Sequence, residues 1–399
     1  MLSAPLIPRK ISDLKNDVYL FRLALWLWFA LAVAVCVKYF LTEGDHSVYP
    51  VYAWGSRHWW ADQPLHAYYP DLNIDIYRYS PTFAVIFTPF AILPIWLGAS
   101  LWCIVNIATT LYALHLMARE ILPGSCTPRQ EAWFLGLTMF GMMAGIWSAQ
   151  INSLLLSLVI FAAVAVKRQQ WWMASFLLAL PVFIKIWPIA AALLMIACWP
   201  KQLSWRFVIV VVVLALLPFL TRPFNMVVGQ YQQWYFSLIE QNKGRWPGFR
   251  DAWTIWENIR PPVSRHVYQV LQLASAFLVL LWCLYQRRRI ASTGGLLTGI
   301  ISIWVSWQLL FGPGAEQLTY GILAPSVVWA MLISFVEKKH RLWTALTWLT
   351  LVLLSCGELE TFLCGIHPAF AALLPLSAVS FAVWLVIYEE KGSNLYNVS

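Results

Sequence analysis

Residues 19–41 have the sequence YLFRLALWLWFALAVAVCVKYFL, an apolar run in which only Arg22 and Lys38 are charged. About 20 consecutive apolar residues are enough to cross the hydrocarbon core of a bilayer as a helix. The run is too long for the apolar region of a cleavable signal peptide, and the residues before it, through Asp17, are polar. The sequence therefore predicts a first membrane-spanning helix that remains in the mature protein as an anchor.

Further apolar runs continue to Tyr388, and short polar or basic stretches separate them. The chain is 60% hydrophobic and 11% charged, whereas a soluble protein carries about 25% charged residues. An ordinary cytosolic enzyme is excluded, and an all-α polytopic membrane protein is predicted as a single domain over residues 1–399, with about twelve spans. The two short predicted spans that meet at Lys185 are also consistent with one bent or re-entrant hairpin. The expected spans lie near residues 19–41, 95–118, 132–149, 150–166, 171–185, 186–199, 206–220, 266–285, 295–312, 318–336, 341–356 and 366–388.

The net charge of +9 comes mainly from basic residues in short loops beside the apolar runs. Such residues set the orientation of a membrane protein, because short cytoplasmic loops are enriched in Lys and Arg. We therefore expect both termini in the cytoplasm, membrane lipids as surroundings, and no nucleic-acid partner. The basic residues assigned to the cytoplasmic side are Arg9, Lys10, Lys15, Arg22, Arg119, Arg129, Lys167, Arg168, Lys201, Arg206, Arg287, Arg288, Arg289, Lys338, Lys339, Arg341 and Lys391.

This orientation places two long segments, residues 42–94 and 221–265, on the extracytoplasmic side. Both mix Trp, Tyr and Pro with carboxylates and guanidinium groups, a composition that suits the membrane interface and also a polar ligand. Residues 81–93 are apolar but too short to span, so they are predicted to form an interfacial helix lying against the membrane. The active-site side of the protein is expected at these two segments.

Asp45 follows the first predicted span and is the first candidate for catalysis. A carboxylate that borders a low-dielectric region and still reaches water can have a raised pKa, which suits a general base. The alternative is a solvated loop acid near the end of a helix. From this position alone, both interpretations remain open.

The segment from Asp71 to Pro81 carries two carboxylates and Arg78 just before the predicted interfacial helix. Asp71 and Asp75 suit a divalent metal together with a substrate phosphate, although two loop acids are also expected simply to be solvated. Arg78 lies between Tyr77 and Tyr79, and a planar guanidinium binds phosphate or sugar hydroxyl groups through paired hydrogen bonds. No cofactor is expected to be required, and a divalent metal remains an option.

Lys185 is flanked on both sides by apolar residues. A charged residue at membrane depth costs about 3 kcal/mol and is by default a functional hypothesis. If the turn that contains it reaches the surface, Lys185 is instead a snorkelling tip. The sequence alone does not choose between these interpretations.

The second long segment places cations among aromatic residues, an arrangement that suits an anionic lipid head and a sugar ring, and equally suits anchoring at the headgroups. Glu316 lies in a Gly-Pro-Gly turn between two predicted helices, where a lone acid is unusual. No phosphate-binding glycine loop, GxSxG elbow or CxxC pair occurs, which argues against a nucleotide-driven transporter. The residues of interest in the second segment are Arg222, Lys243, Arg245, Arg250, Asp251, Glu257, Arg260, Arg265, Trp234, Tyr235, Trp246, Trp253 and Trp256.

Several ordered pieces of the first half of the chain resemble one known family. These pieces are Gly44-Asp45 with Tyr49, the stretch Tyr79-Ser80-Pro81 leading through Pro89 to Leu93-Pro94 and Trp102, the stretch Gln150-Ile151-Asn152-Ser153-Leu154-Leu155-Leu156, and Lys185 with Pro188. In these pieces the chain resembles glycosyltransferase family 87 of the GT-C superfamily, whose members use polyprenyl-phosphate sugars. The later half matches less well, because Gly248-Phe249-Arg250-Asp251-Ala252-Trp253 stands where an Asn-Gln-Ser motif is expected, and Glu316 stands where some relatives have a histidine.

The resemblance implies a GT-C-type fold and the transfer of a sugar, most often mannose, from a polyprenyl-phosphate donor to a lipid or glycan acceptor hydroxyl at the extracytoplasmic face. The membrane is expected to be a bacterial plasma membrane. Asp45 would be the general base and would act with inversion at the anomeric carbon. Lys185, Arg78 and Arg250 would bind the donor phosphate. The further candidate substrate contacts are Tyr49, Tyr79, Gln150, Asn152, Asp251 and Glu316.

Two other functions are consistent with a polytopic chain that has few intramembrane charges. One is a secondary transporter or lipid flippase, but the sequence shows no internal repeat with interrupted helices in corresponding places, and its polar residues gather in the outer loops. The other is a structural membrane subunit without catalysis, in which Asp45 would tolerate replacement.

Overall fold

The computed structural model describes residues 11–44, 46–72, 74–124, 126–241, 248–257, 264–337 and 341–392. Over these residues the protein consists of helices and the turns that join them, and its only β pairing is an isolated antiparallel bridge between Phe249 and Glu316. The predicted all-helical architecture is confirmed. Asp45, the candidate general base, lies outside the described residues.

The helices are given in chain order. The first half contains α1 (Ile11–Thr42), α2 (Tyr49–Trp60), η1 (Pro70–Leu72), α3 (Pro81–Ile86), α4 (Thr88–Ala91), α5 (Ile95–Leu116), η2 (Met117–Ile121), α6 (Pro128–Trp147), α7 (Asn152–Lys167), α8 (Trp171–Ile184) and α9 (Ile189–Cys198). The second half contains α10 (Pro200–Leu216), η3 (Leu217–Leu220), α11 (Phe224–Gln241), α12 (Ala252–Glu257), α13 (Arg265–Arg289), α14 (Thr293–Phe311), η4 (Gln317–Leu323), α15 (Ala324–Glu337), α16 (Arg341–Ser355), α17 (Gly357–Ile366), η5 (Pro368–Ala372) and α18 (Leu373–Gly392).

Several helices begin with side chains that satisfy their free backbone amides. Thr127 accepts from the backbone of Gln130, whose side chain bonds back to Thr127, and together they form a capping box in front of α6. Ser80 caps α3 in a similar way by accepting from Phe83, and Pro81 takes the first helical position, where no amide is needed. These local signals fix where the chain turns into helix.

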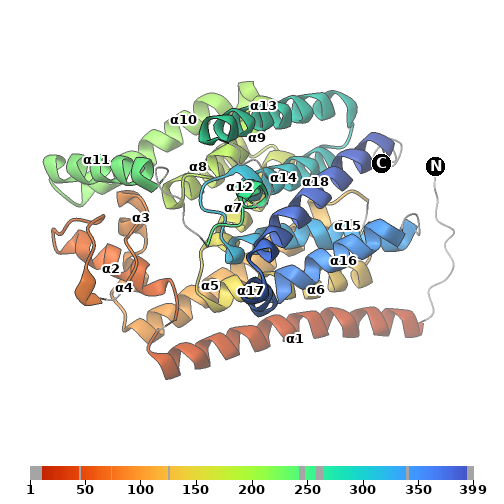
Figure 1. Ribbon diagram of the computed structural model, residues 1–399, viewed down its shortest axis with the longest axis horizontal. Coiled ribbons are helices and arrows are strands. Elements are labelled where there is room, and N and C mark those ends of the chain that lie inside the picture. The colour runs from red at the N-terminus through yellow and green to blue at the C-terminus, as the bar shows by residue number, and fades with distance from the viewer. Residues whose placement is uncertain are drawn as a thin grey trace.

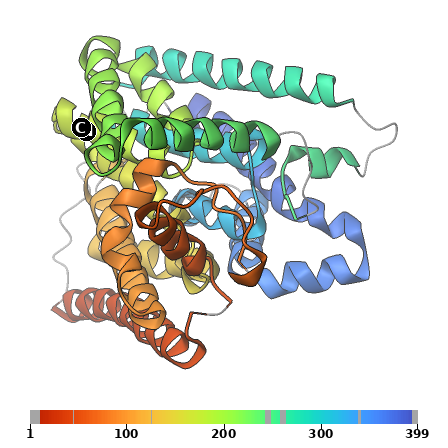
Figure 2. The ribbon, with the colours of Figure 1, turned by 90° about the vertical axis from the view of Figure 1, so that its left-hand side faces the viewer.

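The long helices form a bundle with two different ends (Figure 1). The start of α1 and the end of α18 lie at one end, which we call the basic end because it carries Arg119, Lys167, Arg168 and Arg287. The opposite end, here called the loop end, carries α2, α3, α4 and α11. Figure 2 looks onto it and shows α11 crossing in front, above α2. The first and last described helices therefore start and finish on the same side of the bundle.

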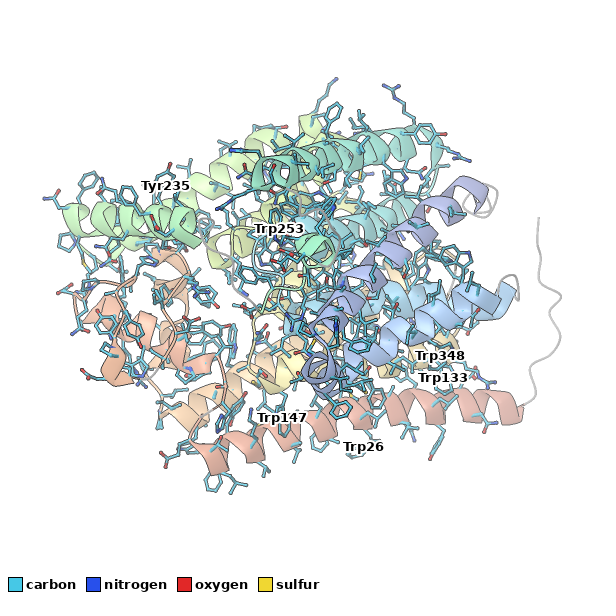
Figure 3. The ribbon with its side chains drawn as sticks, in the orientation of Figure 1. Trp26, Trp133, Trp147, Tyr235, Trp253 and Trp348 are labelled. Atoms are coloured by element: carbon cyan, nitrogen blue, oxygen red, sulfur yellow. The ribbon has the colours of Figure 1, made fainter. Side chains whose placement is uncertain are left out.

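Seven helices of the described chain are long and apolar enough to cross a bilayer, and four shorter apolar helices accompany them. Each predicted span coincides with a helix, although α8 and α9 have only 14 and 10 residues. Large apolar side chains are exposed on the outside of the bundle, among them the labelled Trp26, Trp133 and Trp348 (Figure 3). Such a surface needs a lipid environment, so the chain is an integral membrane protein.

The loop end differs from the prediction in its local structure. Residues 81–93 do not form one interfacial helix: they form α3 and α4, which meet at Phe87, and Pro81 through Ala84 are buried under α2. Phe87 packs against Tyr52 and Trp102, with ring centroids 5.4 Å and 5.0 Å apart. Thr88 is followed by Pro89, which breaks the helical path at this point. The aromatic packing makes this segment part of the protein core.

Candidate functional site

Lys185 lies in the short connection between α8 and α9 at the loop end. Pro181 interrupts the last turn of α8, and Lys185 adopts an extended backbone directly after Ile184. Trp187 then stacks on Trp304 of α14, with ring centroids 5.6 Å apart. The connection is thereby fixed against the neighbouring helix, and Lys185 is partly buried within the protein.

The Lys185 ammonium donates a hydrogen bond to Asn152 Oδ1 at 3.1 Å. Asn152 is the first residue of α7 and is buried; its Nδ2 donates to Gln150 Oε1 at 2.6 Å and to Thr319 Oγ1 at 3.3 Å. Because Asn152 begins a helix, the positive end of the α7 dipole lies beside Lys185. These residues come from three separate parts of the chain, and we call Gln150, Asn152, Lys185 and Thr319 the amide cluster.

The Tyr79-Ser80 turn is fastened to the same connection. Ser80 Oγ donates to the Phe183 carbonyl, two residues before Lys185, while it also caps α3. Tyr79 is buried, with its ring centroid 5.0 Å from that of Tyr52. Arg78 is partly exposed and pairs with Asp75 at 3.2 Å. Ser80 therefore holds the Arg78 and Tyr79 segment next to the Lys185 connection.

The second predicted outer segment, residues 221–265, is hydrogen-bonded to the turn that precedes η4. The Arg250 amide donates to the Ala315 carbonyl at 2.6 Å, and the Tyr320 hydroxyl donates to the Arg250 carbonyl at 2.5 Å. Phe249 and Glu316 form the isolated bridge. These bonds keep Arg250 and Glu316 on adjacent strands of backbone at the loop end.

The charges around Lys185 influence its protonation. Burial lowers the pKa of Lys185 to about 8, the Glu316 carboxylate acts to raise it, and the Arg78 guanidinium acts to lower it. Burial also raises the pKa of Tyr79, on which Glu316 and Arg78 act as well. Glu316 and Arg78 are therefore close enough to Lys185 to belong to one electrostatic site. Within the described residues, however, no carboxylate lies within 4 Å of the Lys185 ammonium.

The described residues on either side of Asp45 are bound to the turn between α6 and α7. The Lys38 ammonium and the Tyr39 hydroxyl both donate to the Trp147 carbonyl, at 2.8 Å and 2.7 Å, and the Val48 amide donates to the Ser148 carbonyl at 3.0 Å. Ala149 has a φ of 55° in this turn. Non-glycine residues with positive φ are uncommon and cluster at functional sites. The turn leads directly into Gln150 and Asn152.

Other predicted site residues have structural partners. Tyr49 is fully buried and donates to the Phe90 carbonyl at 2.8 Å, so the structure does not bring it to the amide cluster. Asp251 accepts from the backbone amide of Thr254 at 3.2 Å and so caps α12. Asp71 and Asp75 belong to no group of three or more potential metal ligands in the part of the chain that the structure describes.

Thr319 is a member of the amide cluster that the sequence does not single out. It stands in an apolar stretch of η4, and nothing in its neighbourhood distinguishes it from the hydroxyl residues that pack between membrane helices. Its role depends on a contact with Asn152, 167 residues away in the chain. Only the tertiary fold identifies this residue.

Comparison with known proteins gives a family match and distant similarities to solved structures. The solved structure of ArnT from Cupriavidus metallidurans bound to undecaprenyl phosphate is similar with a TM-score of 0.45 and 13% sequence identity, over 92% of this chain and 77% of that chain. No curated protein matches significantly. The model of glycosyltransferase family 87 matches residues 77–334, about two thirds of the chain, and this span contains Arg78, Asn152, Lys185 and Glu316. The chain therefore belongs to glycosyltransferase family 87.

Proposed function

We propose that this protein transfers a sugar, mannose in our interpretation, from a polyprenyl-phosphate donor to an acceptor hydroxyl at the extracytoplasmic face of a bacterial plasma membrane. The acceptor is a lipid or a glycan. Asp45 acts as the general base, and Lys185, Arg78 and Arg250 receive the phosphate of the donor. In this proposal the loop end is extracytoplasmic, both termini are cytoplasmic, and the helices form a GT-C-type fold.

The observation that carries the proposal is the setting of Lys185. Its ammonium is partly buried at the loop end of an apolar bundle, it is held by an uncharged amide, and it lies beside the start of α7. Such a cation suits the phosphate of a lipid carrier, because the negative charge that develops on the leaving phosphate is best stabilised by a group that is already in place. A carrier embedded in the bilayer also accounts for an enzyme built almost entirely of apolar helices.

The role of Asp45 is supported by its neighbours along the chain. Gly44 has a φ of 88°, and its Cβ position would lie 2.5 Å from the Ile95 side chain, so a larger residue there would force Ile95 to move. Ser47 donates to the Gly44 carbonyl at 2.7 Å. The described backbone on both sides of Asp45 is thus tightly turned and bound to the segment that leads to Asn152.

The reaction follows from these assignments. The acceptor hydroxyl attacks the anomeric carbon of the donor sugar from the face opposite the phosphate, and its proton passes to Asp45. The bond between the anomeric carbon and the phosphate oxygen breaks, and the electron pair leaves with the polyprenyl phosphate. Lys185, with Arg78 and Arg250, stabilises this oxygen as it becomes negative. The sugar is delivered with inverted configuration.

The direct test is to incubate the purified full-length protein with labelled polyprenyl-phosphate mannose and a membrane lipid extract. We expect a labelled product that is absent from incubations with nucleotide-activated mannose alone. A donor panel that replaces mannose with other hexoses identifies the sugar. If no polyprenyl-phosphate sugar yields product while the protein remains folded, the proposal fails.

A further inference from the structure

The amide cluster contains a polar side chain whose orientation is fixed on all sides. Asn152 has one oxygen and one nitrogen at its tip, and each has a defined partner. An ammonium group only donates hydrogen bonds, so the Asn152 atom that faces Lys185 must be the oxygen. The nitrogen then meets the Gln150 and Thr319 oxygens, both of which accept. The network is self-consistent in one orientation only.

We propose that Asn152 is a positioning residue, which holds the Lys185 ammonium with an uncharged oxygen and thereby leaves its positive charge available to the phosphate of the donor. This inference rests on the proposed function, since it takes the donor phosphate as the anion that Lys185 receives. It assigns to Asn152 an action through Lys185 in place of a contact with the sugar.

The absence of charge on Asn152 decides what Lys185 can do. A carboxylate at 3.1 Å would form an ion pair and compete with an incoming phosphate for the same ammonium. A purely apolar neighbour would leave a partly buried cation without a hydrogen bond, which favours the uncharged amine. An amide oxygen avoids both outcomes, because it satisfies one donor of the ammonium and does not neutralise it.

The other charged groups around Lys185 do not replace Asn152. Glu316, from the turn before η4, favours the charged form of Lys185 from beyond ion-pair distance, and Arg78, from the segment before α3, opposes it. Arg78 is itself paired with Asp75. Tyr79 is buried, and its raised pKa keeps it neutral over the physiological range. Asn152 is therefore the direct partner of Lys185 among the described residues.

Two substitutions of Asn152 act on Lys185 in opposite directions. Asn152→Asp places a carboxylate beside the ammonium and is expected to raise the pKa of Lys185 by about 1 unit or more. Asn152→Leu keeps the branched shape of the side chain but removes the acceptor, and is expected to lower the pKa of Lys185. The shift in Asn152→Leu is the diagnostic one: a carboxylate raises the pKa of any nearby lysine, whereas replacing a residue that only packs α7 against η4 by leucine would leave the pKa of Lys185 unchanged.

The measurement is competitive acylation of the lysines of the full-length protein over a series of pH values, with mass spectrometry of the peptide that contains Lys185. Lys167 and Lys201, exposed at the basic end, serve in the same sample as lysines whose pKa the Asn152 variants should leave unchanged, and elution as a folded protein checks the fold. The donor-affinity arm uses undecaprenyl phosphate as the probe and the uncharged undecaprenol as its matched control. We expect the phosphate to protect Lys185 from acylation in the natural protein, and we expect weaker protection in Asn152→Asp at pH 7.

The outcomes distinguish the positioning role of Asn152 from the proposed phosphate site at Lys185. Shifts of equal sign in the two variants, or no shift in either, overturn the positioning role of Asn152. If undecaprenyl phosphate fails to protect Lys185 in the natural protein, the proposed phosphate site falls, and with it the phosphate part of this inference. Failure of both variants to fold would make Asn152 a packing residue and overturn its positioning role, whereas the protection experiment on the natural protein would still decide whether Lys185 receives a phosphate.

Discussion

The two ends of the helix bundle each hold a polar cluster around one charged side chain. The charged side chain has charged partners at one end and an uncharged partner at the other. At the basic end the Glu131 carboxylate is fully buried, 2.5 Å from His115 Nδ1 and 2.7 Å from Arg119 Nε. At the loop end the Lys185 ammonium has an amide oxygen of Asn152 as its direct partner. The negative charge of Glu131 is compensated by neighbouring basic side chains, whereas the positive charge of Lys185 has no direct charged partner among the described residues.

We interpret this difference as the one between a structural cluster and the proposed phosphate-binding site. The Glu131 cluster joins α6 to the end of α5 and to η2, and its carboxylate also lies in the first turn of α6, where a negative charge is favoured. The Glu131 carboxylate is therefore paired within the protein. A partly buried cation with an uncharged partner is costly unless a ligand completes its contacts, which is why we propose a functional role for Lys185.

The largest effect is expected from Asp45→Asn, which should lower the turnover number by about 10²–10⁴-fold, since it removes the proposed general base. Expression and elution as a folded protein should be unchanged. Transfer from labelled donor is the measurement, and Glu43→Gln, an exposed acid two residues earlier, is the matched control. Full turnover in Asp45→Asn would remove this residue from the mechanism.

Lys185→Ala is expected to lower kcat/KM for the donor by about 10²-fold, because the charge that stabilises the leaving phosphate is lost. Lys167→Ala serves as the control at the opposite end, where Lys167 donates to the Glu120 carbonyl. Steady-state kinetics at pH 7 for both variants gives the comparison. Equal losses in the two variants would mean that the distinction between the ends is wrong.

Glu131→Gln should lower the free energy of unfolding by about 3 kcal/mol, because it removes the charged partner of Arg119 in a buried cluster. Turnover per folded molecule should remain near that of the natural protein. Glu120→Gln breaks a more exposed pair with Arg168 and should cost less than about 1 kcal/mol. Denaturation in detergent measures both, and a catalytic defect without lost stability in Glu131→Gln would contradict a structural role.

The smallest effect is a change in pH dependence. Lys185 is charged below its pKa, which burial lowers to about 8, so donor affinity should fall as the pH rises through that value. Glu316 acts to raise this pKa, and Glu316→Gln should move the fall to lower pH. The donor KM measured at a series of pH values tests this expectation, with Asp71→Asn as an exposed control. A shift to higher pH would show that Glu316 acts in another way.

The sequence predicted the long helices well, because a bilayer-spanning helix is apolar along its whole length and needs no tertiary contact to be detected. α2 and α11 were missed. Both are rich in Trp, Tyr and polar residues, and their helical form depends on packing at the loop end: Arg222, just before α11, bonds to the Trp59 carbonyl at 3.1 Å and pairs with Asp62 at 3.2 Å. Hydropathy does not reveal such helices.

Several residues of the site were predicted one by one, but their convergence was not. Lys185 and Glu316 stood out because charges are rare in apolar surroundings, and Gln150 and Asn152 stood out through a resemblance to a family. Their convergence into one cluster follows from the fold, since Asn152 and Thr319 are 167 residues apart in the chain. Asp45 stays a prediction, and so do the sugar and the acceptor. A hydrogen-bond network between distant residues leaves no pattern in a single sequence.

The isolated bridge between Phe249 and Glu316 fixes more than the position of a loop. In an antiparallel pair, directly opposed side chains project to the same face and alternate residues project to opposite faces. From this geometry we expect Phe249 to share a face with Glu316 and Arg250 to project to the other. If this register slipped by one residue, the Arg250 guanidinium would replace the Phe249 ring beside the Glu316 carboxylate. The bridge thus determines which side of this strand-like segment is cationic and which is aromatic.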